Sequence, residues 1–151
     1  MTDNPARAKA DAFEIVREIT RRAGHEIRNA LNGVAVNVEV VRSRVARDGP
    51  ASDVASFAER AASQIGEAGA LTEGLLALVG NVLAAEARGT LGAAPGAGGG
   101  SRLELMIYGD RAGAFVSDIK RLADRIGVGV EQHAERVILT VSPEGKSHSK
   151  I

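Results

Sequence analysis

Apolar residues recur every three or four positions through the first half of the chain, which is the period of an amphipathic helix. The first stripe comprises Ala12, Val16, Ile19, Ala23, Ile27, Ala30, Val34, Val38, Val41 and Val45. It predicts a helix from about Ala6 to Arg47. The following Asp48-Gly49-Pro50 sequence ends that helix, because glycine favours a helix C-cap and proline cannot continue the helix.

A second stripe with the same period predicts a second long helix, with Ser52 or Asp53 as its N-cap. This stripe comprises Val54, Phe57, Ala61, Ile65, Ala68, Leu71, Leu75, Leu78 and Val82. Two helices joined by a short turn form an antiparallel hairpin, in which residue 25 lies near the level of residues 72–74. Because a hairpin encloses no core, we expect its stripes to be buried against a second copy or against the C-terminal segment.

The C-terminal third has a different pattern. Residues 89–101 are mostly glycine and alanine, which predicts a flexible linker. Alternating apolar residues at 103–107, a helical stripe from Ala112 to Ile126 and apolar runs at 128–130 and 137–141 predict the order β-α-β-β. We therefore expect an α+β fold with a hairpin in 1–88, a linker in 89–101, a small layer in 102–142 and a tail in 143–151.

Composition narrows the classes of function. The chain of 151 residues has 19 basic and 19 acidic residues and no cysteine. Equal charges give no electrostatic case for nucleic acid or an anionic membrane, and the lack of cysteine excludes disulfides and thiolate metal sites. No uninterrupted apolar run reaches about 18 residues, and the start lacks the apolar core of a signal peptide. We expect a soluble, cytoplasmic protein without a membrane span.

His25 does not belong to the first apolar stripe. It lies two positions from both Ala23 and Ile27, and is therefore turned by roughly 200° from each. Its imidazole should face solvent or a partner. The same outward face carries Arg21, Arg22, Arg28, Asn29 and Asn32, and it continues through Gly33, Val36 and Val40, which form a smooth apolar patch able to receive another protein.

The heptapeptide His25-Glu26-Ile27-Arg28-Asn29-Ala30-Leu31 resembles the phospho-acceptor box of two-component sensor histidine kinases. In that family the box commonly reads His-Glu-Leu/Ile-Arg-Asn/Thr-Pro-Leu. Ala30 replaces the proline that bends the family's helix, so we expect a straighter helix here. The resemblance covers about residues 12–87, and it implies a homodimeric four-helix bundle with two His25 sites on its outside.

The resemblance, together with the chemistry of phosphoryl transfer, suggests roles for residues in the box and next to it. A neutral imidazole is a competent nucleophile toward phosphorus, so His25 would accept the phosphoryl group. Glu26 would hold the second ring N–H, and Asn29 would orient a water for dephosphorylation of a partner aspartate. Arg22 and Arg28 would stabilise the transferring phosphoryl group. Asn32, Gly33, Val36 and Val40 would dock the partner.

By position, the β-α-β-β layer stands where a sensor kinase carries its ATP-binding domain. The family's ATP site needs an asparagine-bearing helix, and the helix predicted at 115–126 has no asparagine. The Asp124–Gly129 segment comes closest to the family's adenine-binding turn, but ordinary helix termination explains it better. His133 and His148 lack partners at metal-ligand spacing. We therefore expect this chain to bind no cofactor or metal, with Mg²⁺ supplied by a receiver domain.

The leading hypothesis is a histidine phosphotransfer protein of a two-component phosphorelay. It would carry phosphate on His25 between the receiver domains of response regulators, without an ATP site of its own. One alternative is a sensor-kinase-like protein that is phosphorylated in trans or acts as a receiver phosphatase through Asn29. Another is a dimeric adaptor that binds a signalling partner without chemistry.

Overall fold

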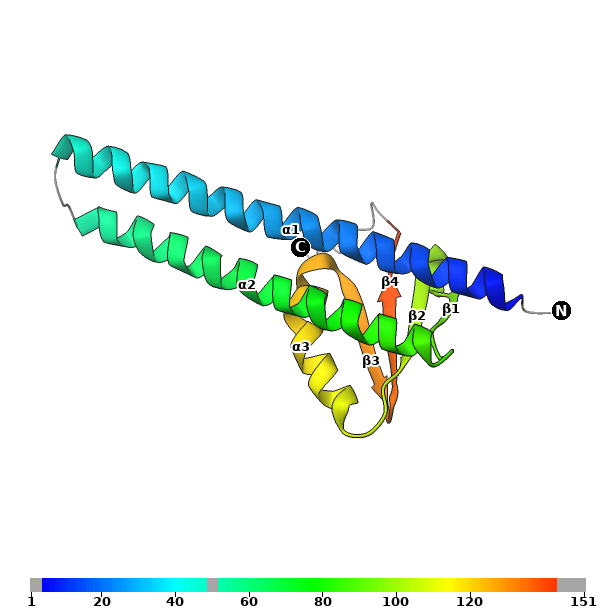
Figure 1. The fold of residues 1–151 in the computed structure, drawn as a ribbon. Helices are drawn as coiled ribbons and strands as arrows, with labels where there is room; N and C mark the ends of the chain where they lie inside the picture. Colours follow the sequence, from blue (N-terminus) through cyan, green and yellow to red (C-terminus); the bar gives the residue numbers. More distant parts are fainter. Residues whose placement is uncertain (1–3, 49–51, 144–151) are drawn as a thin grey trace.

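The computed structural model describes residues 4–48 and 52–143, and it has an α+β fold (Figure 1). In chain order the elements are α1 (Pro5–Asp48), α2 (Ser52–Ala87), β1 (Gly92–Pro95), a 3-10 turn η1 (Ala97–Gly99), β2 (Ser101–Met106), α3 (Arg111–Ile126), β3 (Val128–His133) and β4 (Arg136–Val141). The predicted turn at residues 49–50 and the predicted tail after residue 143 lie outside the described residues.

α1 and α2 form the predicted antiparallel hairpin. Three polar side-chain pairs join the helices at different heights, namely Lys9 with Glu86, Asn37 with Gln64, and Arg44 with Asp53. The midpoint of each pair falls close to residue 49, as the predicted turn requires. This register agrees with a position for His25 near the level of residues 72–74.

The C-terminal elements form a four-stranded antiparallel sheet in the order β1-β2-β4-β3. The predicted β-α-β-β order is confirmed by β2, α3, β3 and β4. Gly127 ends α3 in the left-handed conformation, and its N–H donates to the carbonyl of Ala123. This is the helix termination expected from the glycine in the Asp124–Gly129 segment.

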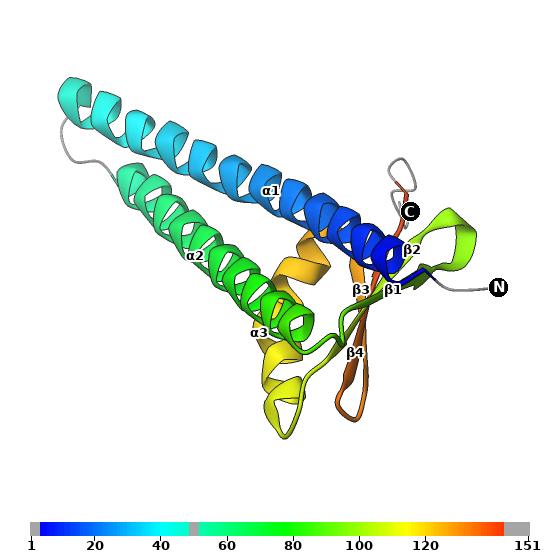
Figure 2. The same cartoon turned by 45° about the vertical axis from the view of Figure 1, so that its right-hand side comes forward.

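One face of the sheet packs against all three helices, so the hairpin and the C-terminal layer share one core. α3 and the lower part of the hairpin, namely the N-terminal half of α1 and the C-terminal half of α2, lie on that face (Figures 1 and 2). The core includes Ile15, Ile19, Leu71 and Leu78 from the hairpin, Ile119 and Leu122 from α3, and Leu103, Leu105, Val137 and Leu139 from the sheet. The expected burial of the hairpin against the C-terminal segment is confirmed for this part.

The prediction of a flexible linker at 89–101 is wrong for most of that segment. Residues 92–95 form β1, which pairs with β2 and adds an edge strand to the sheet. The glycines serve a tight connection instead: Gly98 and Gly99 have φ of 64° and 80°, and Gly100 lies against the backbone of β4. A glycine-rich composition therefore reflected close packing rather than a loose chain.

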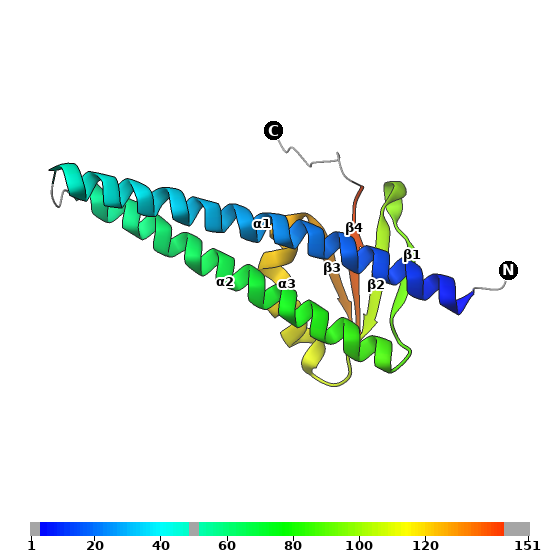
Figure 3. The ribbon, with the colours of Figure 1, turned by 45° about the horizontal axis from the view of Figure 1, so that its top comes forward.

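The distal part of the hairpin, toward the turn, extends beyond the C-terminal layer (Figure 3). Here several residues of the predicted stripes are exposed, including Val38 and Val45 of α1 and Ile65 of α2. Leu31 of α1 is also more than half exposed, as are Leu76 and Leu83 in the C-terminal half of α2. α2 is long and apolar enough to pass a test for a membrane span by length and composition, although a third of its most apolar window is buried in this fold. The cytoplasmic location stays a prediction.

We predict that Gly100→Val destabilises the fold by about 1–3 kcal/mol, because a side chain there overpacks the contact with the end of β4. A Cβ at this position would lie 2.8 Å from the carbonyl oxygen of Val141. Urea unfolding followed by circular dichroism measures the change. Gly113→Ala is the control, since Gly113 lies within α3 and a Cβ there meets nothing within 4 Å. It should raise stability by about 0.5–1 kcal/mol, and equal stability of the two variants would contradict the packing argument.

Candidate functional site

His25 lies on the solvent side of α1, opposite the buried residue Ala23. Its predicted exposure is confirmed. α1 continues as an unbroken helix through the heptapeptide, and Ala30 is buried. His25 lies near the border of the C-terminal layer, because Arg22 and Glu26 on either side of it contact that layer.

Arg28, Asn29 and Asn32 are exposed together with His25. Positions 25, 28, 29 and 32 are spaced by three or four residues, so they share one face of α1. Within residues 4–48 and 52–143, none of these four side chains forms a hydrogen bond or an ion pair. This face, called here the His25 face, therefore presents an imidazole, a guanidinium and two amides that are available to a partner.

Glu26 does not bind His25 in this structure. It is half-buried, and its Oε2 accepts a hydrogen bond from Nε of Arg125 in α3 at 2.9 Å. No hydrogen bond joins Glu26 to His25 in the described part of the chain. The carboxylate expected to hold the imidazole is thus engaged by the C-terminal layer.

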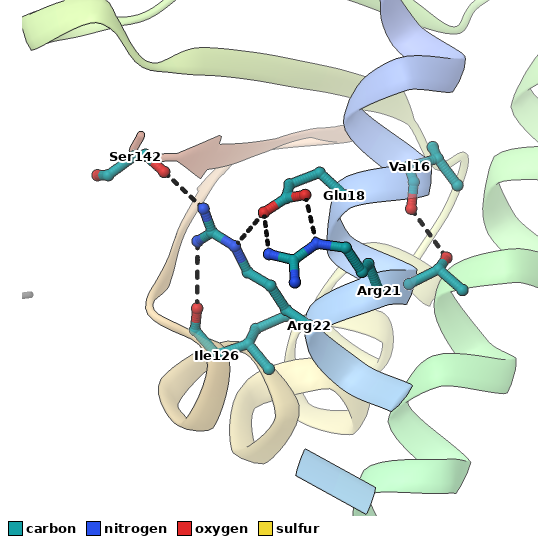
Figure 4. A network of polar contacts seen from close by, with 7 residues as sticks. Val16, Glu18, Arg21, Arg22, Ile126 and Ser142 are labelled. Atoms are coloured by element: carbon teal, nitrogen blue, oxygen red, sulfur yellow. Dashed lines mark hydrogen bonds and ion pairs between the residues drawn. The ribbon is translucent and has the colours of Figure 1, made fainter. Parts of the chain in front are cut away.

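Arg22 joins the hairpin to the C-terminal layer (Figure 4). Its guanidinium donates to Glu18 at 2.7 Å, to the carbonyl of Ile126 at 3.4 Å and to the carbonyl of Ser142 at 2.7 Å. Its side chain is only 16% exposed. Although Arg22 was predicted to face outward and to stabilise a phosphoryl group, it lies against the ends of α3 and β4, where a cation also complements the helix dipole.

The predicted docking residues do not all share one surface. Asn32 is exposed and Val36 is 64% exposed, whereas Val40 is half-buried. Gly33 faces α2, because a Cβ there would lie 2.3 Å from Nε2 of Gln64. The side-chain amide of Asn37 donates to the carbonyl of Gly33 and to Gln64. The exposed docking surface of the predicted set therefore consists of Asn32 and Val36.

Two residues of this region were missed by the sequence analysis. Glu18 lies three and four residues before Arg21 and Arg22, and this helical spacing could have revealed their ion pairs. Arg125 is 99 positions from Glu26, and nothing in the local pattern marks that contact. Among the described residues, no group of three or more His, Cys, Asp and Glu side chains could hold a metal ion.

Comparisons with protein-family models, with curated proteins and with solved structures find no significant match for this chain.

We predict that Glu18→Gln lowers the free energy of unfolding by about 1 kcal/mol at neutral pH. Hydrogen bonds from Arg21, and then from Arg22, hold the pKa of the Glu18 carboxyl below its ordinary value of 4.5. The unfolded state thus binds the proton more readily, and the stabilisation is full above pH 4.5 and is lost as the pH falls through the lowered pKa. Urea unfolding at a series of pH values should show the difference between wild type and variant shrinking in acid.

The matched control is Glu14→Gln, because Glu14 is exposed and its ion pair with Arg17 is long, at 3.8 Å. This variant should have nearly wild-type stability at every pH. A difference between wild type and Glu18→Gln that stays constant down to pH 2 would contradict the assigned role of the Glu18 carboxylate.

Proposed function

We propose that this chain is a histidine phosphotransfer protein that carries phosphate on His25 between the receiver domains of response regulators. The observation that carries the proposal is the exposed imidazole on an unbroken helix, which has no hydrogen bond among the described residues and lies within the heptapeptide that resembles a kinase phospho-acceptor box. The exposed side chains of Arg28, Asn29 and Asn32 support it, because phosphoryl transfer depends on positioning and electrostatics more than on new covalent chemistry.

The proposed step is an exchange of one P–O bond for one P–N bond. The lone pair of a neutral ring nitrogen of His25 attacks the phosphorus of an aspartyl phosphate on the receiver. The bond from phosphorus to the aspartate oxygen breaks, and the aspartate leaves as a carboxylate with the bonding electrons. The positive charge that develops on the ring is stabilised if Glu26 accepts the second ring N–H. Transfer to a second receiver is the reverse reaction.

Arg28 is the cation best placed to stabilise the transferring group. It lies three residues from His25 on the same face and has no ion pair within the described residues. Arg22 contributes differently, since its hydrogen bonds hold the hairpin on the C-terminal layer. The Mg²⁺ needed for the reaction would be supplied by the receiver domain.

We further propose that two copies of the chain form a four-helix bundle. The exposed residues Leu31, Val38 and Val45 of α1 are seven positions apart, so they share a face. Around the helix axis, that face is separated from His25 by roughly 120–160°. On α2, the exposed residues Ile65, Leu76 and Leu83 lie at helical spacing, with Gly69 and Gly80 on the same side. Burial of these residues against a second copy would leave the His25 face outside.

A receiver phosphatase is the second candidate function. It is favoured by Asn29, whose exposed amide lies one turn from His25 and has no hydrogen bond in the described part of the chain. Such an amide can orient a water toward the phosphorus of a docked receiver. This activity would need Asn29 but would survive, in part, without His25.

We predict that His25→Ala abolishes phosphate transfer while leaving the fold intact, because the variant removes the only nucleophile of the proposed step from an exposed position. A panel of receiver domains labelled with radioactive phosphate is mixed with each protein, and acid-labile label on the chain is counted. His133→Ala is the matched control, since His133 is exposed at the far end of β3. It should take up label like the wild type.

Label on His25→Ala would refute His25 as the acceptor. If the wild type takes no label from any receiver, the same mixtures are followed for loss of receiver phosphate. Loss that falls with Asn29→Ala would identify the phosphatase. No loss would leave a dimeric adaptor that binds its partner without chemistry.

We predict that Leu76→Glu converts a dimer into monomers, because it places a charge in the proposed apolar interface of α2. Leu76 is 66% exposed in the single chain, so the substitution should not unfold it. Sedimentation equilibrium measures the mass. Val36→Glu is the control on the His25 face; it should leave the mass dimeric and weaken receiver docking. A monomeric wild type would overturn the proposed bundle.

A further inference from the structure

Two arginines on one side of α3 tie this helix to the hairpin. Nε of Arg121 donates to Glu67 of α2 at 2.6 Å, and Nε of Arg125, one turn later, donates to Glu26 of α1 at 2.9 Å. α3 is itself fixed in the shared core by buried Ile119, Leu122 and Ile126. Only the second of these two ion pairs engages a residue next to the imidazole of His25.

The ion pair of Arg125 determines where the carboxylate of Glu26 lies. Adjacent helical residues are turned by about 100° from each other, so a glutamate at position 26 must bend back along the helix surface to meet His25. Here it extends to α3 instead, and no Glu26–His25 hydrogen bond is formed among the described residues. Arg125 thus holds on the α3 side the group that would stabilise the charged imidazole.

The Arg125–Glu26 ion pair is weak enough to open readily. The Arg125 side chain is 50% exposed and that of Glu26 is 24% exposed. Such pairs contribute little to stability because solvent screens them. Arg22, in contrast, is largely buried and is bound to backbone carbonyls of the C-terminal layer. The layer therefore stays attached through its core and Arg22 when the Arg125–Glu26 pair breaks.

We propose that Arg125 is a positioning residue that restrains Glu26, so that phosphate transfer at His25 requires the Arg125–Glu26 ion pair to open. This inference rests on the proposed phosphotransfer function and adds a control of it by the C-terminal layer. The layer then sets the reactivity of the acceptor by competing with the imidazole for one carboxylate.

Single-turnover transfer from a phosphorylated receiver to the full chain tests the proposal. Arg125→Gln should raise the rate at saturating receiver by about two- to five-fold, the range that a weak exposed ion pair allows, with an unchanged half-saturating receiver concentration. Arg121→Gln is the matched control, because it breaks the neighbouring ion pair with Glu67 and leaves Glu26 held. It should transfer at the wild-type rate. In a Glu26→Gln background, Arg125→Gln should have no effect.

Several results would overturn the proposal. A lower maximal rate in Arg125→Gln would mean that Arg125 assists the reaction. A changed half-saturating receiver concentration would mean that Arg125 contacts the receiver. A gain that persists without Glu26, or an equal gain in Arg121→Gln, would also contradict it.

A second measurement does not depend on phosphate transfer. Long-range proton–nitrogen NMR spectra report the tautomers of the His25 ring, and Arg125→Gln should change them because the freed carboxylate can accept a ring N–H. Arg121→Gln should not change them. If no receiver labels the wild type but the ring responds in this way, the restraint stands and the phosphotransfer function fails. An unresponsive ring overturns the restraint itself.

Discussion

The burial of the lower hairpin against the sheet is the contact on which the rest of this structure depends. A two-helix hairpin encloses no core, and a four-stranded sheet needs a cover on its apolar face. α3 covers part of that face, while α1 packs on β1 and β2 and α2 packs on β2. Leu71 and Leu78 of α2 are almost completely buried as a result. The shared core fixes the height of the sheet on the hairpin, and thereby the place of His25 at its border.

Two arginine contacts at this border differ in what they can do. Arg22 satisfies the carbonyls of Ile126 and Ser142 from a largely buried position, so its loss would leave polar groups without partners. Arg125 is half exposed and binds a carboxylate that solvent also reaches. The contacts of Arg22 are therefore suited to hold the hairpin and the C-terminal layer together. The Arg125–Glu26 ion pair is suited to open and close at little cost in free energy. Both flank the same turn of α1.

The sequence predicted the elements well because their signals are local. Helical spacing located α1, α2 and α3, alternation located β2, and Gly127 marked the end of α3. The linker prediction failed because glycine serves both loose and tightly packed backbone, and only the tertiary contact of Gly100 with Val141 distinguishes the two. Exposure of His25 followed from helical phase alone. The placement of Arg22 and the Arg125–Glu26 contact did not, since both depend on residues about 100 positions away.

His25 lies between a part of α1 that is covered by the C-terminal layer and a part that is exposed. The C-terminal layer covers the side of α1 that carries Arg22 and Glu26, which leaves little space there for a large partner. Further toward the turn of the hairpin, the exposed residues Leu31, Val38 and Val45 form an apolar face on another side of the helix. A second copy bound to that face would leave the imidazole uncovered, because the two faces are separated by roughly 120–160° around the helix. His25 thus lies on an exposed face while its neighbour Glu26 is bound to Arg125 of α3.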